Sequence, residues 1–220
     1  MYQRALIIGA SGGIGAAVAE AVPAQELVLA SRRVDGLDIT QETSVAAWVG
    51  GLQGSFDLIF VATGALEIGG QGPEKSFAAL EAETMARAYA INAIGPALLF
   101  KHLQTHLPRE GRSVFACLSA RVGSIGDNGL GGWVSYRAAK AALNQVVRTA
   151  AIELARSRPE AICAALHPGT VTTDLTQKYL GRHPAVAPSE AASNLLGVIN
   201  GLAPSDTGGF FDWTGAPVPW

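Results

Sequence analysis

The sequence predicts an α/β fold, a single domain in which a doubly wound, mostly parallel sheet carries helices on both faces. Short, almost continuously apolar segments alternate with longer segments of helical spacing along the 220 residues. Strands that are covered on both faces have this character because neither face meets water. The composition, 49% hydrophobic and 15% charged, supplies a large core and excludes a disordered chain. No composition shift or linker marks a boundary, so we expect residues 1–220 to form one domain.

Five apolar segments are the expected strands, and four segments with helical spacing are the expected helices. The strands cover residues 5–8, 27–30, 58–62, 113–118 and 161–166. The helices cover residues 13–22, 80–107, 134–156 and 189–202, and each is followed by a proline, which commonly stands just past a helix end. Strands that alternate with helices predict right-handed crossovers between parallel strands.

One connection is too short for this pattern. Only six residues separate Ser31, at the end of the second strand, from Asp38, where the strand-like segment LDIT begins. A complete crossover with its helix needs at least about 10–12 residues. We therefore expect one helix to be trimmed at this point.

The first expected strand leads directly into the glycine-rich segment GASGGIG at residues 9–15. Glycine permits a tight turn, the close approach of backbone N–H groups to a pyrophosphate, and close contact between helix and strand. The following helix N-terminus favours an anion. A flexible turn is the alternative, but the position between a strand and a helix favours a dinucleotide site. The expected cofactor-binding residues here are Gly9, Ser11, Gly13, Ile14 and Gly15.

The end of the second strand indicates which dinucleotide is bound. An acidic residue there would accept a hydrogen bond from the ribose 2′-hydroxyl of NAD, but the residues are Ser31, Arg32 and Arg33. A hydroxyl and two guanidinium groups suit a 2′-phosphate, since arginine forms bidentate, charge-assisted bonds to phosphate. An ordinary solvated basic pair is the alternative. The sequence favours NADP(H) over NAD(H).

Tyr136 and Lys140 are the expected catalytic pair. They stand four residues apart in a helical segment, so their side chains share one helix face. A free phenol has a pKa near 10, and a neighbouring ammonium favours the phenolate and moves that pKa towards the working pH. This adjustment is what general acid–base catalysis requires.

The glycine spacing that opens with Gly9, followed later by the Tyr136–Lys140 pair, resembles the short-chain dehydrogenase/reductase family over almost the whole chain. The resemblance implies a Rossmann-type fold in which Tyr136 exchanges a proton with the substrate oxygen and Lys140 holds the nicotinamide ribose. It also implies that Asn92 anchors a water behind the lysine; a buried structural asparagine is the alternative. The further cofactor contacts that it implies are Asp38, Ile39, Ala62, Gly64, Asn92, Pro168, Gly169, Val171 and Thr173.

The family's carbonyl-orienting serine has no direct counterpart. Its expected place, just after the strand at residues 113–118, holds Ala120. Ser119 is adjacent, but on a strand its side chain points to the opposite face. Ser124 follows in the next loop and could reach back, so we expect Ser124 to be the fourth catalytic residue. If neither serine serves, backbone or water must orient the carbonyl.

The segment at residues 121–128, the Gly-Gly-Trp before the tyrosine and the last eleven residues resemble the branch of C-factor and sniffer-type carbonyl reductases. This implies NADP(H)-dependent reduction of a carbonyl, or the reverse oxidation of an alcohol. Some members of the branch are discussed as signalling proteins, and the serine is missing at Ala120, so a regulatory NADP(H)-binding protein with little turnover is the alternative. Residues 171–188 are expected to recognise a modest-sized or hydrophobic substrate.

Several functions are not expected. A net charge of −2 provides no field for nucleic acid or an anionic membrane surface. Cys117 and Cys163 cannot form a disulfide framework or a zinc site alone. His102 and His106 have zinc-pair spacing without an evident third ligand, so no metal is expected. The apolar stretch near the start of the sequence is too short for a signal-peptide core, and the sequence contains no 18-residue apolar stretch. We therefore expect a cytoplasmic protein. The resemblance implies a homo-oligomer, dimer or tetramer, formed through the two long helical segments.

Overall fold

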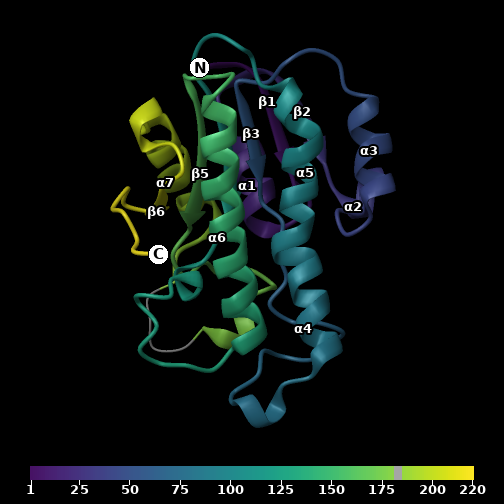
Figure 1. Cartoon of the computed structure of the whole chain (residues 1–220), viewed down its shortest axis with the longest axis vertical. Coiled ribbons are helices and arrows are strands. Elements are labelled where there is room, and N and C mark those ends of the chain that lie inside the picture. The colour runs from purple at the N-terminus through teal and green to yellow at the C-terminus, as the bar shows by residue number, and fades with distance from the viewer. Residues whose placement is uncertain (181–184) are drawn as a thin grey trace.

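The computed structural model describes residues 1–180 and 185–220, and a six-stranded sheet forms its centre (Figure 1). The strands are β1 (Tyr2–Ile8), β2 (Ala24–Ala30), β3 (Leu58–Val61), β4 (Ser113–Leu118), β5 (Ala161–His167) and β6 (Phe210–Asp212). Their order across the sheet is β2-β1-β3-β4-β5-β6, and every neighbouring pair is parallel. The predicted fold class is confirmed.

Helices cover both faces of the sheet (Figure 1). They are α1 (Gly13–Ala21), α2 (Arg32–Asp35), α3 (Glu42–Gly50), α4 (Ala82–Tyr89), α5 (Gly95–Leu103), α6 (Val134–Ala155) and α7 (Pro188–Gly201). Helices α3, α5 and α6 share one hydrophobic core with the sheet, and α1 and α7 share the other. Within the described residues no helix is both long enough and apolar enough to cross a lipid bilayer.

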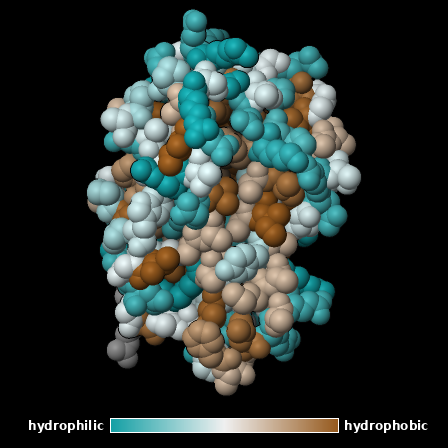
Figure 2. Space-filling model, in the orientation of Figure 1, coloured by the Kyte–Doolittle hydropathy of each residue, from teal (hydrophilic) through white to brown (hydrophobic). Residues whose placement is uncertain are grey.

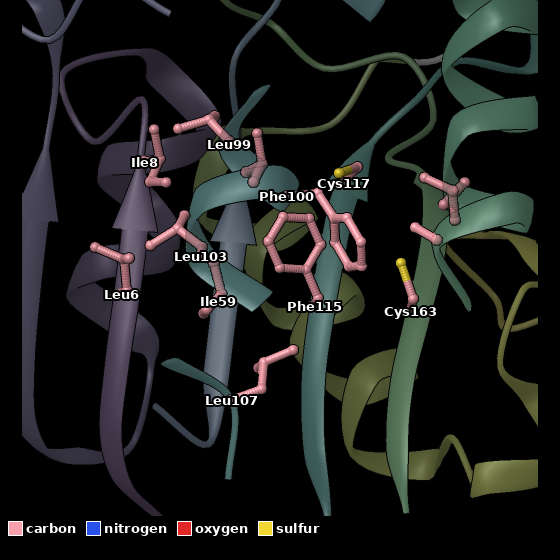
Figure 3. Packing of buried hydrophobic residues seen from close by; sticks show 14 of the residues in the cluster. Leu6, Ile8, Ile59, Leu99, Phe100, Leu103, Leu107, Phe115, Cys117 and Cys163 are labelled. Carbon is pink, nitrogen blue, oxygen red and sulfur yellow. The ribbon is translucent and has the colours of Figure 1, made fainter. Parts of the chain in front are cut away.

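The apolar strands are explained by these two cores. Successive side chains on a strand point to opposite faces, so Leu6 and Ile8 of β1 enter the core beneath α5 while Ala5 and Ile7 enter the other. Figure 3 shows the first core, where the strand side chains face Leu99, Phe100 and Leu103 of α5. The ring of Phe100 meets Phe115 of β4 edge-on, with 5.3 Å between ring centres.

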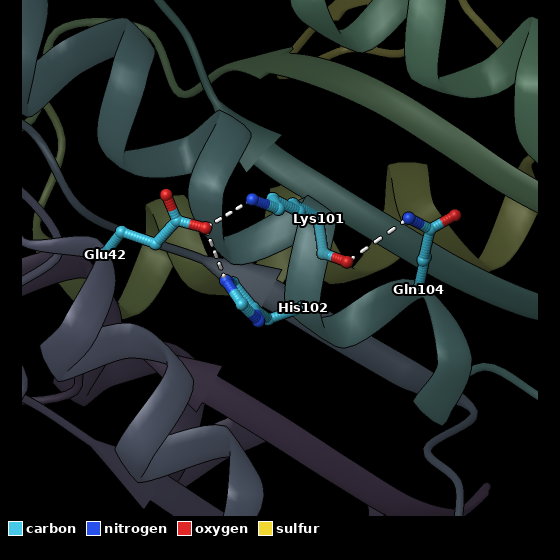
Figure 4. A network of polar contacts seen from close by, with 4 residues as sticks. All are labelled: Glu42, Lys101, His102 and Gln104. Carbon is cyan, nitrogen blue, oxygen red and sulfur yellow. Dashed lines mark hydrogen bonds and ion pairs between the residues drawn. The ribbon is translucent and has the colours of Figure 1, made fainter.

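A polar contact joins α3 to α5 on the outside of the first core (Figure 4). The Glu42 carboxylate accepts a hydrogen bond from the Lys101 ammonium and lies 3.2 Å from His102 Nε2. Glu42 and Lys101 are exposed and His102 is half-buried, so the pairing contributes little to stability. The ring of His106 contacts the Gly54 carbonyl instead, at 2.8 Å. No cluster of three or more His, Cys, Asp or Glu side chains suited to a metal occurs in the described part of the chain.

The prediction of a strand at the segment LDIT is wrong. Residues 37–40 form no strand, and β2 is therefore the edge of the sheet. The Asp38 carboxylate accepts hydrogen bonds from the backbone N–H and the hydroxyl of Thr40, at 3.0 and 2.7 Å, which closes a turn. Leu37 and Ile39 are buried in the first core. The short connection thus retains one helical turn, α2, and loses the outer strand.

The segment 80–107 is helical but not one regular helix. Helix α4 passes through a π-helical turn, Ala90–Ile94, into α5. π-helical turns are frequent at functional sites, and this one carries Asn92. Figure 2 shows more apolar surface in the lower half of the view, where the strands end, than in the hydrophilic upper part. Exposed Phe77 begins a 3-10 helical turn, and exposed Ile125 and Leu130 belong to loops.

Candidate active site

A cleft of about 1110 Å³ opens at the carboxyl ends of the strands. In open α/β sheets the loops that leave these ends form the ligand site. The cleft lies between the glycine-rich loop, the ends of β3, β4 and β5, and the start of α6. The predicted site residues that line it are Ser11, Gly13, Ile14, Ala62, Gly64, Tyr136, Lys140, Pro168, Gly169, Val171 and Thr173.

The glycine-rich loop is packed so closely that side chains do not fit. Gly9 has φ +86°, and a Cβ on it would lie 2.8 Å from the Ala62 carbonyl oxygen. A Cβ on Gly15 would collide with the Gly9 backbone, and one on Gly13 would lie 2.7 Å from the Thr173 side chain. Gly9 and Gly15 therefore shape the turn from behind, while Gly13 belongs to the cleft wall. This arrangement leaves the backbone of the loop close to a ligand, as a pyrophosphate needs.

Two buried polar atoms in the cleft wall have no hydrogen-bond partner among the described residues. They are the Thr63 hydroxyl oxygen, just after β3, and Nδ1 of His167, at the end of β5. Buried polar atoms are nearly always paired in native proteins, so these two fit a polar ligand. Neither residue is predicted as a site residue from the sequence; their position at strand ends is the signal that could have found them.

Tyr136 and Lys140 meet in the cleft, on successive turns of α6. Lys140 Nζ lies 5.8 Å from the centre of the Tyr136 ring and donates a hydrogen bond to the Leu118 carbonyl, at 2.9 Å. Burial lowers the pKa of Lys140 to about 8 and raises that of Tyr136 to about 12. Both shifts have one physical cause, which is that a low-dielectric wall disfavours the charged form of each group. The expected lowering of the Tyr136 pKa by the neighbouring ammonium is therefore wrong for the protein without its cofactor.

Asn92 lies behind this pair and is completely buried. Its amide nitrogen donates to the carbonyls of Ala65 and Ala88, at 2.9 and 3.0 Å, and its oxygen accepts from the Ala65 N–H at 3.0 Å. A Cβ on Gly64 would lie 3.2 Å from the Asn92 oxygen and 3.4 Å from Lys140 Nζ. The asparagine thus ties the loop after β3 to the π-helical turn and borders the lysine without lining the cleft.

The structure does not bring Ser124 to the cleft. Its hydroxyl donates to the Pro219 carbonyl and accepts from the Asp127 N–H, at 3.2 Å, so it anchors the C-terminal segment. Ser119 does line the cleft, but its hydroxyl donates to Asn144 Oδ1 at 2.6 Å. Ala120 lies between them in the cleft wall. The catalytic role of Ser124 stays a prediction, and this geometry does not support it.

The residues expected at the adenosine end lie outside the cleft wall. The Ser31 hydroxyl caps α2 by accepting from the Val34 N–H at 3.2 Å, and Asp35 folds back to accept from the Ser31 N–H at 2.7 Å. Arg32 and Arg33 are exposed, and neither has an ion-pair partner among the residues described. Asp35 is an acid at the end of β2 that the sequence does not predict. It stands four residues after Ser31 in the sequence, but helix α2 turns the chain back so that its carboxylate contacts Ser31.

Asp38 and Ile39, the remaining predicted cofactor contacts, interact with other residues of the protein. The hydrogen bonds from Thr40 lower the pKa of the Asp38 carboxyl, and the Arg32 guanidinium acts in the same direction. The Ile39 side chain packs where a Cβ on Gly95 would have to lie, 2.7 Å from Ile39 Cδ1. Neither residue lines the cleft, so their contact with a cofactor stays a prediction.

Aromatic and apolar side chains form the cleft mouth. The Trp133 ring lies edge-on to Tyr136 and to Tyr179, with 6.4 and 5.6 Å between ring centres. The Tyr179 hydroxyl donates to Glu67 at 2.9 Å, which joins the two sides of the mouth. The expected recognition segment 171–188 falls only partly within the described residues, because 181–184 lie outside them.

His167 is expected to make the fold sensitive to mild acid. Burial lowers its pKa from 6.5 to about 4, against the opposing influence of Asp212. Between these values the unfolded chain binds a proton that the folded protein does not, so the free energy of unfolding falls as the pH falls. The full loss is up to about 3 kcal/mol.

Urea unfolding at several pH values between about 4 and 7 measures this loss. His167→Gln is expected to flatten the pH dependence, whereas His106→Gln, at the opposite end of the sheet, leaves it unchanged. An equal slope in wild type and His167→Gln contradicts the assignment.

Comparison with known proteins identifies the family. The family model described as enoyl-(acyl carrier protein) reductase matches residues 20–201. The 1-hydroxy-2-glutathionyl-2-methyl-3-butene dehydrogenase of Rhodococcus sp. (strain AD45) is 32% identical over 188 residues, which are 84% of this chain and 79% of the relative. C-signal of Myxococcus xanthus is 38% identical over 138 residues, 62% of this chain and 78% of the relative.

Solved structures agree with this fold. The carbonyl reductase Sniffer of D. melanogaster superposes with a TM-score of 0.84 at 19% identity, over 100% of both chains. The NADPH-bound carbonyl reductase from chicken fatty liver gives 0.83 at 23% identity, over 99% of this chain and 94% of that one. The family match spans most of the sequence and confirms the predicted resemblance: the chain belongs to the short-chain dehydrogenase/reductase family of oxidoreductases.

Proposed function

We propose that this protein is an NADP(H)-dependent oxidoreductase that reduces a carbonyl or oxidises the corresponding alcohol. One observation carries the proposal: the glycine-rich loop, the Tyr136–Lys140 pair and the Pro168–Gly169 segment all face one cleft. The similarity to the Rhodococcus 1-hydroxy-2-glutathionyl-2-methyl-3-butene dehydrogenase and to an NADPH-bound carbonyl reductase supports it. We further propose that residues 1–220 act as one cytoplasmic domain and self-associate.

The cleft residues fit a dinucleotide. The backbone of the glycine-rich loop would hold the pyrophosphate at the start of α1, where free N–H groups favour an anion. Arg32 and Arg33 would pair with a 2′-phosphate. Thr63 and His167, whose buried hydroxyl and Nδ1 have no partner among the described residues, would border the ligand in the cleft wall. When bound, the cofactor supplies the hydride, and the protein supplies orientation and electrostatics.

Tyr136 is proposed to hand a proton to the substrate oxygen during reduction and to recover it during oxidation. Its side chain lines the cleft, one helical turn before Lys140. The Lys140 ammonium stabilises the phenolate that remains after proton transfer, because an opposite charge nearby favours the charged form. Asn92 and Gly64 hold the space beside the lysine fixed.

Ala120 is expected to limit the rate. No hydroxyl occupies this place in the cleft wall, and the side chains of Ser119 and Ser124 are engaged elsewhere. Because one donor aimed at the reacting oxygen contributes up to about 10²–10³ in kcat, Ala120→Ser is expected to raise kcat/KM at least about 10-fold.

Ala120→Cys is the matched control, since it adds a side chain of similar size with a poor donor. Ser124→Ala tests the remaining prediction for that residue, and an unchanged kcat with lower stability identifies it as a structural anchor. If the wild-type protein is active and Ala120→Ser leaves kcat/KM unchanged, residue 120 does not contact the substrate carbonyl.

A regulatory NADP(H)-binding protein with little turnover is the second candidate. The alanine in place of the orienting serine and the similarity to C-signal favour it. Titration of the protein with NADPH and NADH, followed by a turnover screen over aldehydes, ketones and quinones, separates the two candidates. Tight NADPH binding with turnover supports the oxidoreductase; tight binding without turnover supports the regulatory protein; preference for NADH contradicts the role of the two arginines.

A further inference from the structure

Helix α6 begins without a capping side chain of its own. Its N-cap residue is Trp133, which makes no side-chain hydrogen bond to the helix. The first N–H groups of a helix have no partner within the helix, and a Ser, Thr, Asp or Asn at the N-cap usually accepts from one of them. The first turn of α6, which contains Tyr136, therefore needs an acceptor from elsewhere.

Glu74 supplies that acceptor from a distant loop. Its carboxylate accepts from the Ser135 backbone N–H at 3.2 Å and from the Ser135 hydroxyl. The side chain is only 7% exposed although it is an acid. A carboxylate at a helix N-terminus is further favoured by the helix dipole. Glu74 thus caps helix α6 from a position 61 residues before Ser135 in the chain.

The same residue holds the strained backbone before the helix. Trp133 is the one non-glycine residue with positive φ in the described chain, at +52°, and it follows Gly131 and Gly132 at +64° and +66°. The Trp133 N–H donates to the Glu74 carbonyl at 2.5 Å. Bulky residues occupy this conformation only where the surroundings impose it. The main-chain carbonyl of Glu74 holds the Trp133 N–H, and the Glu74 carboxylate holds the adjoining first turn of the helix at Ser135.

Two site residues depend on this clamp. Trp133 closes the cleft mouth and contacts both Tyr136 and Tyr179 with its ring edge, and Tyr136 immediately follows the clamped Ser135. We propose that Glu74 is a positioning residue: it fixes the Trp133 ring as the wall against which an apolar, ring-bearing substituent of the substrate packs, and it sets the orientation of the Tyr136 hydroxyl. This assignment rests on the proposed carbonyl chemistry of the cleft.

The test compares Glu74→Ala and Glu74→Gln with Asp57→Ala. Asp57 is the matched control because it also accepts from backbone N–H groups, those of Gln3 and Arg4, but at the amino ends of the strands. For each variant, kcat and KM are measured with an aromatic and a small aliphatic aldehyde. Acrylamide quenching of the Trp133 emission, defined as the part lost in Trp133→Phe, is measured alongside NADPH affinity.

Glu74→Ala is expected to lower kcat/KM for the aromatic aldehyde about 10–100-fold, more than for the aliphatic one, since displacement of about 1 Å costs up to about 10²-fold. Quenching of Trp133 rises, NADPH affinity stays within about twofold, and Glu74→Gln, which retains an acceptor oxygen, recovers most of the loss. Asp57→Ala lowers stability without changing the aldehyde preference.

The outcomes are separable from the proposed function. If wild type binds NADPH and turns over no carbonyl, the oxidoreductase proposal fails, and the quenching of Trp133 still decides whether Glu74 fixes the ring. If Glu74→Ala leaves both the aldehyde preference and the quenching at wild-type values, the clamp has no role at the site and the inference is overturned.

Discussion

Tyr136→Phe is expected to lower kcat by about 10²–10⁴, the range that general acid–base catalysis contributes. The substitution removes the proton that the substrate oxygen needs and keeps the ring that packs on Trp133. Burial raises the pKa of Tyr136 to about 12 in the free protein, so the phenol is protonated but is a weak acid. The same burial makes the ammonium of Lys140 important for the phenolate that forms.

Steady-state turnover and an NADPH titration on the same preparation check this expectation. Cofactor affinity is expected to stay close to wild type, because the loss concerns proton transfer. Tyr179→Phe is the matched control: it removes a cleft phenol that bonds to Glu67, and its kcat is expected to change little. Turnover that survives in Tyr136→Phe would falsify the assignment of the proton donor.

The double variant Arg32→Ala/Arg33→Ala is expected to bind NADPH about 100-fold more weakly, about 10-fold for each arginine, and NADH about equally well. Both guanidinium groups are exposed and have no ion-pair partner among the described residues. They are therefore available to a 2′-phosphate, and since exposed charges are screened, the loss should shrink as salt is raised.

Fluorescence titration with both cofactors at low and high salt measures the effect, and Arg109→Ala, an exposed arginine in the loop before β4, is the control. Equal losses for NADPH and NADH would place the arginines elsewhere than at the phosphate. The Asp35 carboxylate offers a further check. It is bonded to the Ser31 N–H, so Asp35→Asn should favour NADPH if the phosphate lies beside it, because a negative charge is removed.

Much of the fold was determined by local features of the sequence. The strands are apolar on both faces because helices cover both faces of the sheet. Their positions could therefore be predicted from the apolar segments alone, without knowing which strands pair. The glycine-rich loop and the Tyr136–Lys140 pair were equally visible, because backbone freedom at Gly9 and the spacing along one helix are properties of neighbouring residues. The sequence likewise predicted that Asn92 lies in a helical segment. It did not predict that this part of the segment is a π-helical turn.

Contacts between distant segments were decided only by the tertiary structure. Leu37 and Ile39 alternate like a strand, yet they enter the core from a turn, because burial of alternate side chains does not require a paired backbone. The Ser124 hydroxyl turns away from the cleft because it donates a hydrogen bond to the Pro219 carbonyl, 95 residues later. Glu74 caps the helix that carries Tyr136 from 61 residues away. Hydrogen bonds of this kind form when the folded chain brings donor and acceptor together, so no pattern along the sequence specifies which partner a buried polar group will find.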